Sequence, residues 1–247
     1  MKIGFFSEAG YTGKIERNNP NIRTDSAWVC ALDATHHPIS LLHQIPDNTY
    51  DFGIMIIPKN KEELYNYPLI EQMKRVCNKI GTMQESTYWY WQGGTVQSQL
   101  WYHNILQSMD IIFCHNDMDL KYYKGITDVR CELMPTLMIT DHVKTYDGER
   151  KGVMVGGNWV TAYRGFDSYI ISKILSDNIT SPTTGRKYLH PDLSVPDGDM
   201  EQARKLATRL VSDEEFYIKC STEAKKNYNK LYTESIWKEK INKIITK

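Results

Sequence analysis

Short apolar runs alternate with helical patterns about five times in the first 117 residues, and this alternation constrains the fold most. The apolar runs cover residues 2–6, 39–42, 50–58, 80–84 and 110–116, and the helical patterns cover residues 24–34, 62–79 and 97–109. Strands that alternate with helices pair in parallel, because each helix carries the chain back to the starting edge of the sheet. We therefore expect an α/β protein with a Rossmann-like parallel sheet.

The loops that follow the strands mark where a ligand can bind. In an open parallel sheet, ligands bind beyond the carboxyl ends of the strands. The loops expected at that edge cover residues 7–21, 58–61, 84–94 and 115–119. Gly10 and Gly13 lie in the first loop, and His115 opens the last. His115 is either a site residue or a hydrogen-bonded residue at a strand end.

A second and shorter region begins near residue 151. An apolar run ends there in Gly156, Gly157 and Asn158, and a helical pattern with Arg164 near its start follows. Glycine lets the backbone approach a ligand closely, and a helix N-terminus beside an arginine attracts anions. The region is therefore either a phosphate site or a tight turn with a surface arginine.

The two regions predict two lobes. We expect an N-terminal Rossmann-like lobe at residues 1–150 and a smaller Rossmann-like lobe at residues 151–247. Helices close the second lobe, and their expected starts lie at Asp199 and Asp213, each with acidic residues in the first turn. Lysines recur along these closing helices among acidic residues. They form either a solvated helix face or a DNA contact. These lysines are Lys225, Lys226, Lys230, Lys238, Lys240, Lys243 and Lys247.

Composition excludes several classes of protein. The chain is 41% apolar and 24% charged, which is typical of a folded globular protein and excludes a disordered chain. Thirty basic residues balance thirty acidic ones, so the surface as a whole does not attract nucleic acid, although a local basic groove remains compatible with this balance. Five separated cysteines without CxxC spacing predict reduced thiols and a cytoplasmic protein. The apolar runs are too short for a membrane span.

Three stretches resemble GT-B glycosyltransferases, which transfer sugars from nucleotide sugars. The strand, Gly-Gly-Asn, spacer and Arg-Gly-Phe-Asp of residues 153–167 resemble the start of their C-terminal domain. Residues 109–117 resemble a strand of their N-terminal domain, and residues 198–228 resemble their closing helices. Among these enzymes, the chain is similar to phage enzymes that glycosylate hydroxymethylated cytosine in DNA. The resemblance implies retention of the anomeric configuration. We expect no metal or other cofactor, because a helix terminus and Arg164 can neutralise the charge of the leaving diphosphate.

The resemblance also implies a donor site. The donor diphosphate would rest on Gly156, Gly157, Asn158 and Arg164. Asn158 stands where the family usually has a basic residue, and Arg164 stands where it usually has lysine.

One departure concerns the sugar and the ribose of the donor. The family usually has a pair of glutamates that bind the ribose and orient the sugar, but residues 167–198 of this chain contain no glutamate. One alternative is that Arg186 and Lys187 help to rebuild a donor site. The other is that activity is impaired or needs a second chain, in which case the protein could be a homo-oligomer. The alternative function is a non-catalytic binding or partner subunit with a glycosyltransferase fold.

The acceptor side is expected at the loops of the first lobe. Glu85 follows an expected strand, where it could take the proton of an acceptor hydroxyl or stabilise developing charge on the sugar. Trp89 and Trp91 share one face of an extended chain and could stack on a sugar or a flipped base. Alternatively, these aromatic side chains fill the space between the lobes.

Arg23 and Asp25 complete the expected acceptor side, together with Gly10, Gly13 and His115. Arg23 and Asp25 lie at the expected start of the first helix, where Asp25 or Thr24 can also serve as the N-cap. The partners expected for the whole chain are a nucleotide sugar and either a saccharide or a modified DNA base.

Overall fold

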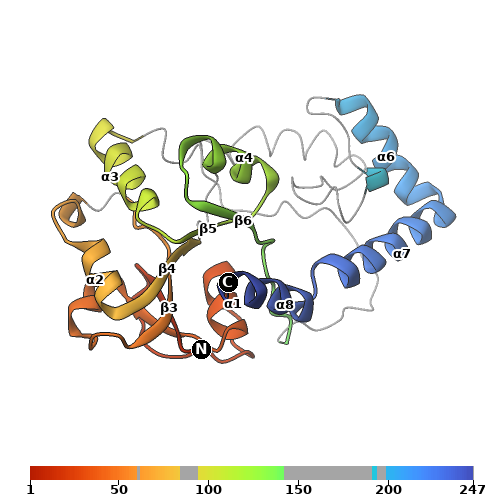
Figure 1. Ribbon diagram of the computed structural model, residues 1–247. Coiled ribbons are helices and arrows are strands. Elements are labelled where there is room, and N and C mark those ends of the chain that lie inside the picture. Colours follow the sequence, from red (N-terminus) through yellow and green to blue (C-terminus); the bar gives the residue numbers. More distant parts are fainter. Residues whose placement is uncertain (60–61, 84–93, 142–190, 194–198, 247) are drawn as a thin grey trace. The chain divides into compact units, whose positions relative to one another are not determined.

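Figure 1 shows a computed structural model that describes residues 1–59, 62–83, 94–141, 191–193 and 199–246. The chain forms two compact units. The first consists of Met1–Val143 and Tyr232–Lys247, and the second consists of Lys144–Leu231. The C-terminal helix therefore belongs to the same unit as the N-terminal strands.

The first unit contains a six-stranded sheet with the order β2-β1-β3-β4-β5-β6, and every neighbouring pair is parallel. All five residues of β1 are buried, as expected for a parallel strand covered on both faces. The sheet confirms the expected α/β fold. The strands are β1 (Ile3–Ser7), β2 (Thr35–Pro38), β3 (Tyr50–Met55), β4 (Cys77–Met83), β5 (Ile111–Cys114) and β6 (Arg130–Leu133).

Helices cover both faces of this sheet (Figure 1). Side chains of α1 (Thr24–Ala31) and α8 (Glu234–Ile245) pack with one face, and those of α2 (Leu69–Val76), α3 (Val96–Gln107) and α4 (Asp117–Ile126) pack with the other. Short 3₁₀ turns lie at Ile39–Gln44 and Glu62–Leu64. No helix in the described part of the chain is long and apolar enough to cross a membrane.

Two helices represent the described part of the second unit. They are α6 (Met200–Ser212) and α7 (Glu214–Leu231), and a 3₁₀ turn at Pro191–Leu193 precedes them. Asp199 accepts a hydrogen bond from the Gln202 N–H at 2.9 Å, and Asp213 accepts one from the Phe216 N–H at 2.9 Å. These contacts confirm the expected helix starts near residues 199 and 213. The second Rossmann-like lobe stays a prediction, because residues 142–190 lie outside the described residues.

The sequence-based prediction was wrong around β2. We expected a strand at residues 39–42 after the helical pattern of residues 24–34, but the strand is β2 at Thr35–Pro38 and a 3₁₀ turn follows it. Ile39 and Leu42 are both buried, and a 3₁₀ turn places residues three apart on the same side. The apolar run was therefore a packed turn rather than a strand.

The helix expected at residues 62–79 is also shorter in the structure. It begins after Pro68, whose ring and missing N–H cannot fit the interior of a helix. It ends at Val76, because Cys77 already belongs to β4. We did not anticipate β6, whose short sequence RCEL alternates charged and apolar residues at the edge of the sheet.

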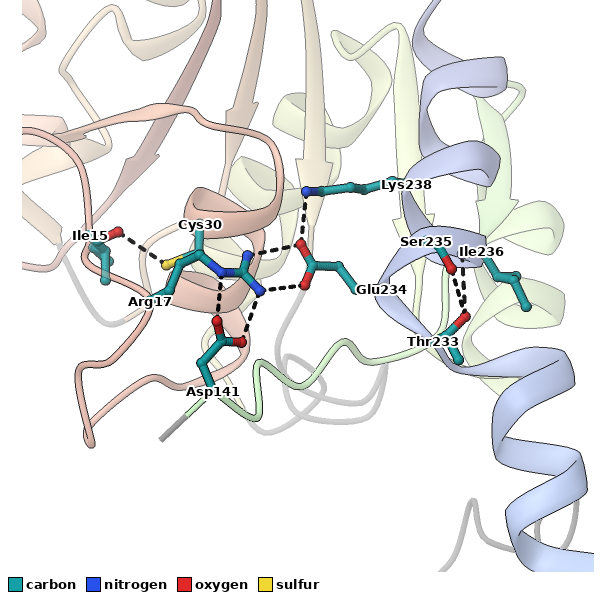
Figure 2. A network of polar contacts seen from close by, with 9 residues as sticks. All are labelled: Ile15, Arg17, Cys30, Asp141, Thr233, Glu234, Ser235, Ile236 and Lys238. Carbon is teal, nitrogen blue, oxygen red and sulfur yellow. Dashed lines mark hydrogen bonds and ion pairs between the residues drawn. The ribbon is translucent and has the colours of Figure 1, made fainter. Parts of the chain in front are cut away.

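Arg17 joins three segments of the first unit that are far apart in the sequence (Figure 2). Its guanidinium donates two hydrogen bonds to Asp141, both at 2.9 Å, and two to Glu234, at 2.9 and 2.7 Å. Lys238 pairs with Glu234 at 2.8 Å. We call these four residues the Arg17 clasp. The clasp connects the loop after β1, the segment after β6 and the first turn of α8.

The clasp makes stability depend on pH. The Arg17 guanidinium, followed by Lys238, lowers the pKa of Glu234 from 4.5 to about 2 against the opposing effect of burial. A carboxyl group with a lowered pKa stabilises the fold above its unfolded pKa, and this contribution is lost as the pH falls through the folded value. We therefore expect the contribution of Glu234 to decline between about pH 4.5 and pH 2.

We expect Glu234→Gln to lower the free energy of unfolding by about 1–2 kcal/mol at pH 7, because it weakens charge-assisted bonds at a partly exposed site. The difference in the free energy of unfolding between variant and wild type should be smaller at pH 3 than at pH 7. Urea unfolding at both pH values measures this free energy. The control is Glu239→Gln on the same helix, whose exposed partner Lys243 predicts a change below about 0.5 kcal/mol. Equal losses in the two variants would contradict the clasp.

Candidate functional site

The strand order places a topological switch point between β1 and β3. From β1 the chain continues to β2 on one side, and it later returns as β3 on the other side. The crevice beyond the carboxyl ends of two such strands is the usual ligand site of an open parallel sheet. Glu8 follows β1 and accepts a long hydrogen bond from the Lys59 N–H, at 3.4 Å, in the loop after β3. Burial lowers the pKa of Lys59 at this position.

A chain of hydrogen bonds beside the switch point fixes the loop after β1. The Tyr11 carbonyl is only an acceptor, so His36 Nδ1 donates to it at 2.7 Å and carries the ring proton. The other nitrogen, His36 Nε2, then accepts from the Ser7 hydroxyl at 2.8 Å. Ser7 Oγ in turn accepts from the Ala9 N–H at 3.1 Å. Burial lowers the pKa of His36, in keeping with this neutral form.

Ser7 and His36 have the hydrogen bond of a nucleophile and its base, but their burial favours a structural role. Ser7 is 4% exposed and His36 is fully buried. The Tyr11 ring stacks on the His36 ring with centroids 3.9 Å apart, which leaves no room for a substrate above the imidazole. The pair therefore holds the loop in place rather than attacking a substrate.

Two of the predicted acceptor residues, Gly13 and Asp25, lie near Tyr11 and His36. Gly13 forms an antiparallel backbone bridge with His36, with both N–H···O distances at 2.9 Å. Burial and then the nearby Asp25 carboxylate raise the pKa of Tyr11. The Tyr11 hydroxyl oxygen is buried and lacks a hydrogen-bond partner within the described ranges. The predicted loop and the start of α1 thus meet at the carboxyl edge of β1.

Arg23 is the N-cap residue of α1, which corrects the expectation that Thr24 or Asp25 caps this helix. The Arg23 backbone N–H donates to Ser26 Oγ at 2.7 Å, and the Arg23 side chain is exposed. Gly10 lies in the same loop as Gly13 but is exposed, and a β-carbon built on it would meet no atom within 4 Å.

His115 lies at the carboxyl end of β5 and is separated from β1 by β3 and β4. Its Nδ1 donates to the Met134 carbonyl at 3.0 Å, which leaves Nε2 as an acceptor. This Nε2 is buried and has no hydrogen-bond partner among the residues that the structure describes. Burial lowers the pKa of His115, and its ring meets Trp28 edge to face with centroids 6.0 Å apart. His115 is therefore a neutral acceptor at the same edge as the switch point but away from it.

The remaining predicted site residues lie outside the described part of the chain, and their roles stay predictions. They are Glu85, Trp89, Trp91, Gly156, Gly157, Asn158, Arg164, Arg186 and Lys187.

Sequence reasoning missed the residues that organise this edge. Arg17 carried no local signal, because Asp141 and Glu234 are 124 and 217 positions away. His36 is not among the expected site residues; it lies next to His37 on β2, so the two side chains point to opposite faces of a sheet that helices cover on both sides.

Comparisons with known proteins assign no family, because no protein-family model, curated protein or solved structure matches the chain. Within the described ranges, no three His, Cys, Asp or Glu side chains lie together in a way that could hold a metal ion. The site is thus defined by its own geometry: two βα loops that meet at the switch point and a neutral histidine farther along the same edge.

Gly13→Ala and Gly10→Ala form a matched test of the loop. Gly13 has a φ of +114°, which L residues rarely adopt, so alanine there should cost about 1–3 kcal/mol in the free energy of unfolding. Alanine at Gly10 meets neither strain nor a clash and should change stability by less than about 1 kcal/mol. Urea unfolding measures both variants. A Gly13→Ala protein as stable as Gly10→Ala would contradict the described loop.

Proposed function

We propose that the protein is a cytoplasmic, metal-independent glycosyltransferase of the GT-B type that moves a sugar from a nucleotide sugar to an acceptor hydroxyl. The observation that carries this proposal is the all-parallel sheet whose switch point lies at the loop after β1, because GT-B lobes are sheets of this kind. The predicted acceptor residues Gly13, Asp25 and His115 all lie at the carboxyl edge of that sheet. The acceptor is a saccharide or a modified DNA base.

The proposed chemistry divides between two sets of residues. Gly156, Gly157, Asn158 and Arg164 hold the diphosphate, whose negative charge grows as the anomeric carbon releases its oxygen. The acceptor oxygen bonds to that carbon with retention, and Glu85 takes the acceptor proton or stabilises the charge on the sugar. Helix-terminal N–H groups and Arg164 supply the positive charge that a metal would otherwise provide.

The alternative is a non-catalytic binding or partner subunit with the same fold. The absence of glutamate from residues 167–198 favours it, because the resemblance places a donor-binding glutamate pair there. Slow hydrolysis of a uridine or guanosine diphosphate sugar distinguishes the two, since only the enzyme breaks the bond to the diphosphate.

We expect Arg164→Ala to weaken nucleotide-sugar binding by roughly 1.5–3 kcal/mol, because it removes charge-assisted hydrogen bonds to the diphosphate. Calorimetric titration of the full chain measures the affinity. Arg204→Ala is the control, since Arg204 is an exposed arginine on α6. Unchanged affinity for Arg164→Ala would remove this residue from the donor site.

We expect Glu85→Gln to lower turnover by about 10²–10⁴-fold with donor affinity nearly unchanged, because a general base acts only as the acceptor proton moves. Steady-state rates together with donor titration separate the two effects. Glu71→Gln on α2 is the control, because that carboxylate is exposed. If turnover of Glu85→Gln stays within about twofold of the wild type, Glu85 is only a polar loop residue.

A further inference from the structure

The last eight residues of α7, which directly follow Glu223, carry a cluster of exposed lysines. Residues 224–231 have the sequence AKKNYNKL, which contains three lysines and no acid. Lys225, Lys226 and Lys230 are all exposed. Within the described residues, none of the three forms an ion pair. This stretch therefore carries about three positive charges in a chain whose net charge is zero.

Five of the other seven basic residues on the three C-terminal helices form ion pairs within the described residues. On α6, Lys205 pairs with Glu201 at 2.7 Å, and Arg209 pairs with Asp213 at 3.0 Å. On α8, Lys238 pairs with Glu234 at 2.8 Å and Lys243 with Glu239 at 2.5 Å. Even Lys219, earlier on α7, pairs with Asp192 at 2.6 Å. Arg204 on α6 and Lys240 on α8 also form no ion pair within the described residues, but among these helices only the end of α7 gathers three such lysines within six residues.

The chemistry of the exposed face favours phosphate over lipid. Thr222, Lys226 and Lys230 follow one another at helical spacing, and Lys225 and Asn229 form a neighbouring row. A shallow depression beside them is lined by Ala224, Lys225, Tyr228 and Asn229, and Tyr228 is 37% exposed. Membrane-surface helices place large apolar side chains opposite a basic face. Here hydroxyl, amide and phenol groups accompany the lysines, as in surfaces that bind nucleic acid, and besides Tyr228 only Leu231 is an exposed large apolar side chain in residues 224–231.

We infer that this face of α7, which we call the α7 basic face (Thr222, Lys225, Lys226, Asn229 and Lys230), binds the phosphate backbone of DNA. Lys226 and Lys230 lie about 6 Å apart along the helix axis, close enough to contact neighbouring phosphates of one strand. The three lysines bind phosphates and the hydroxyl and amide groups donate hydrogen bonds, so the contact is independent of base sequence. The inference rests on the proposed function, in which it selects a DNA base over a free saccharide as the acceptor.

The test measures DNA binding by the full chain without a nucleotide sugar. Fluorescence anisotropy with a labelled 30-base-pair duplex is recorded from 50 to 200 mM NaCl. Each phosphate contact contributes about 0.9 to the slope of log K against log salt, so Lys225→Gln/Lys226→Gln/Lys230→Gln should reduce the slope by about 2.7. Over this range the wild type should then lose about 40-fold more affinity than the triple variant.

The matched control is Lys74→Gln/Lys205→Gln/Lys243→Gln, which removes the same net charge from exposed positions elsewhere. It should keep the wild-type slope. Equal slopes in the two triple variants would mean that binding follows net charge alone and would overturn the inference. If the α7 triple variant does not fold, Lys226→Gln alone should still reduce the slope by about 0.9.

Two further results separate this inference from the proposed function. If the wild type does not bind the duplex at 50 mM NaCl but binds nucleotide sugars, the α7 inference is wrong and a saccharide acceptor follows. If it binds the duplex through these lysines but binds no nucleotide sugar, the α7 inference holds and the proposed function fails. Stronger binding to phosphatidylserine vesicles than to the duplex would overturn the inference in favour of a membrane surface.

Discussion

The contact between Trp28 and Trp237 completes one face of the parallel sheet. A parallel sheet is stable only when both faces are covered. On the face that α1 and α8 share, the two rings meet edge to face with centroids 4.8 Å apart, and Trp28 also meets Phe113 of β5. Trp28 is fully buried and Trp237 is 3% exposed. Loss of a buried tryptophan typically costs about 3–5 kcal/mol, so this contact anchors the C-terminal helix to the N-terminal unit.

The carboxyl edge of the sheet depends on this anchoring. Since α8 is held by Trp237, Glu234 in its first turn can hold Arg17 and thereby the loop after β1. The same loop is held again where Gly13 pairs with His36. Two separate attachments therefore position the loop at the switch point, where Glu8 meets the backbone of Lys59. A preorganised loop at this place is what a binding site needs, because fewer conformations are lost when a ligand binds.

Electrostatic neutralisation gives the two proposals a common basis. The zero net charge of the chain hides an uneven distribution, since Lys205, Arg209, Lys238 and Lys243 pair with acids, while the three lysines at the end of α7 form no ion pair among the described residues. A surface that keeps unpaired lysines retains its attraction for polyanions even in a neutral protein. In the proposed function, Arg164 binds the donor diphosphate. In the α7 inference, a separate set of lysines binds the phosphates of the acceptor DNA.

The sequence by itself determined the class of fold. Apolar runs alternating with helical patterns predicted the parallel sheet, and the acids at Asp199 and Asp213 predicted two helix starts, because these signals act between residues close in the chain. Local patterns did not separate a strand from a packed 3₁₀ turn at residues 35–44, since both bury apolar side chains. They also placed Gly13, Asp25 and His115 near the ligand edge without revealing what surrounds them. Only the tertiary structure decided that His36 is locked between Ser7 and Tyr11, and that Arg17 joins Asp141 to Glu234. Those contacts join residues from 25 to 217 positions apart, and such pairs are set by how the packed helices and strands bring side chains together rather than by any local pattern.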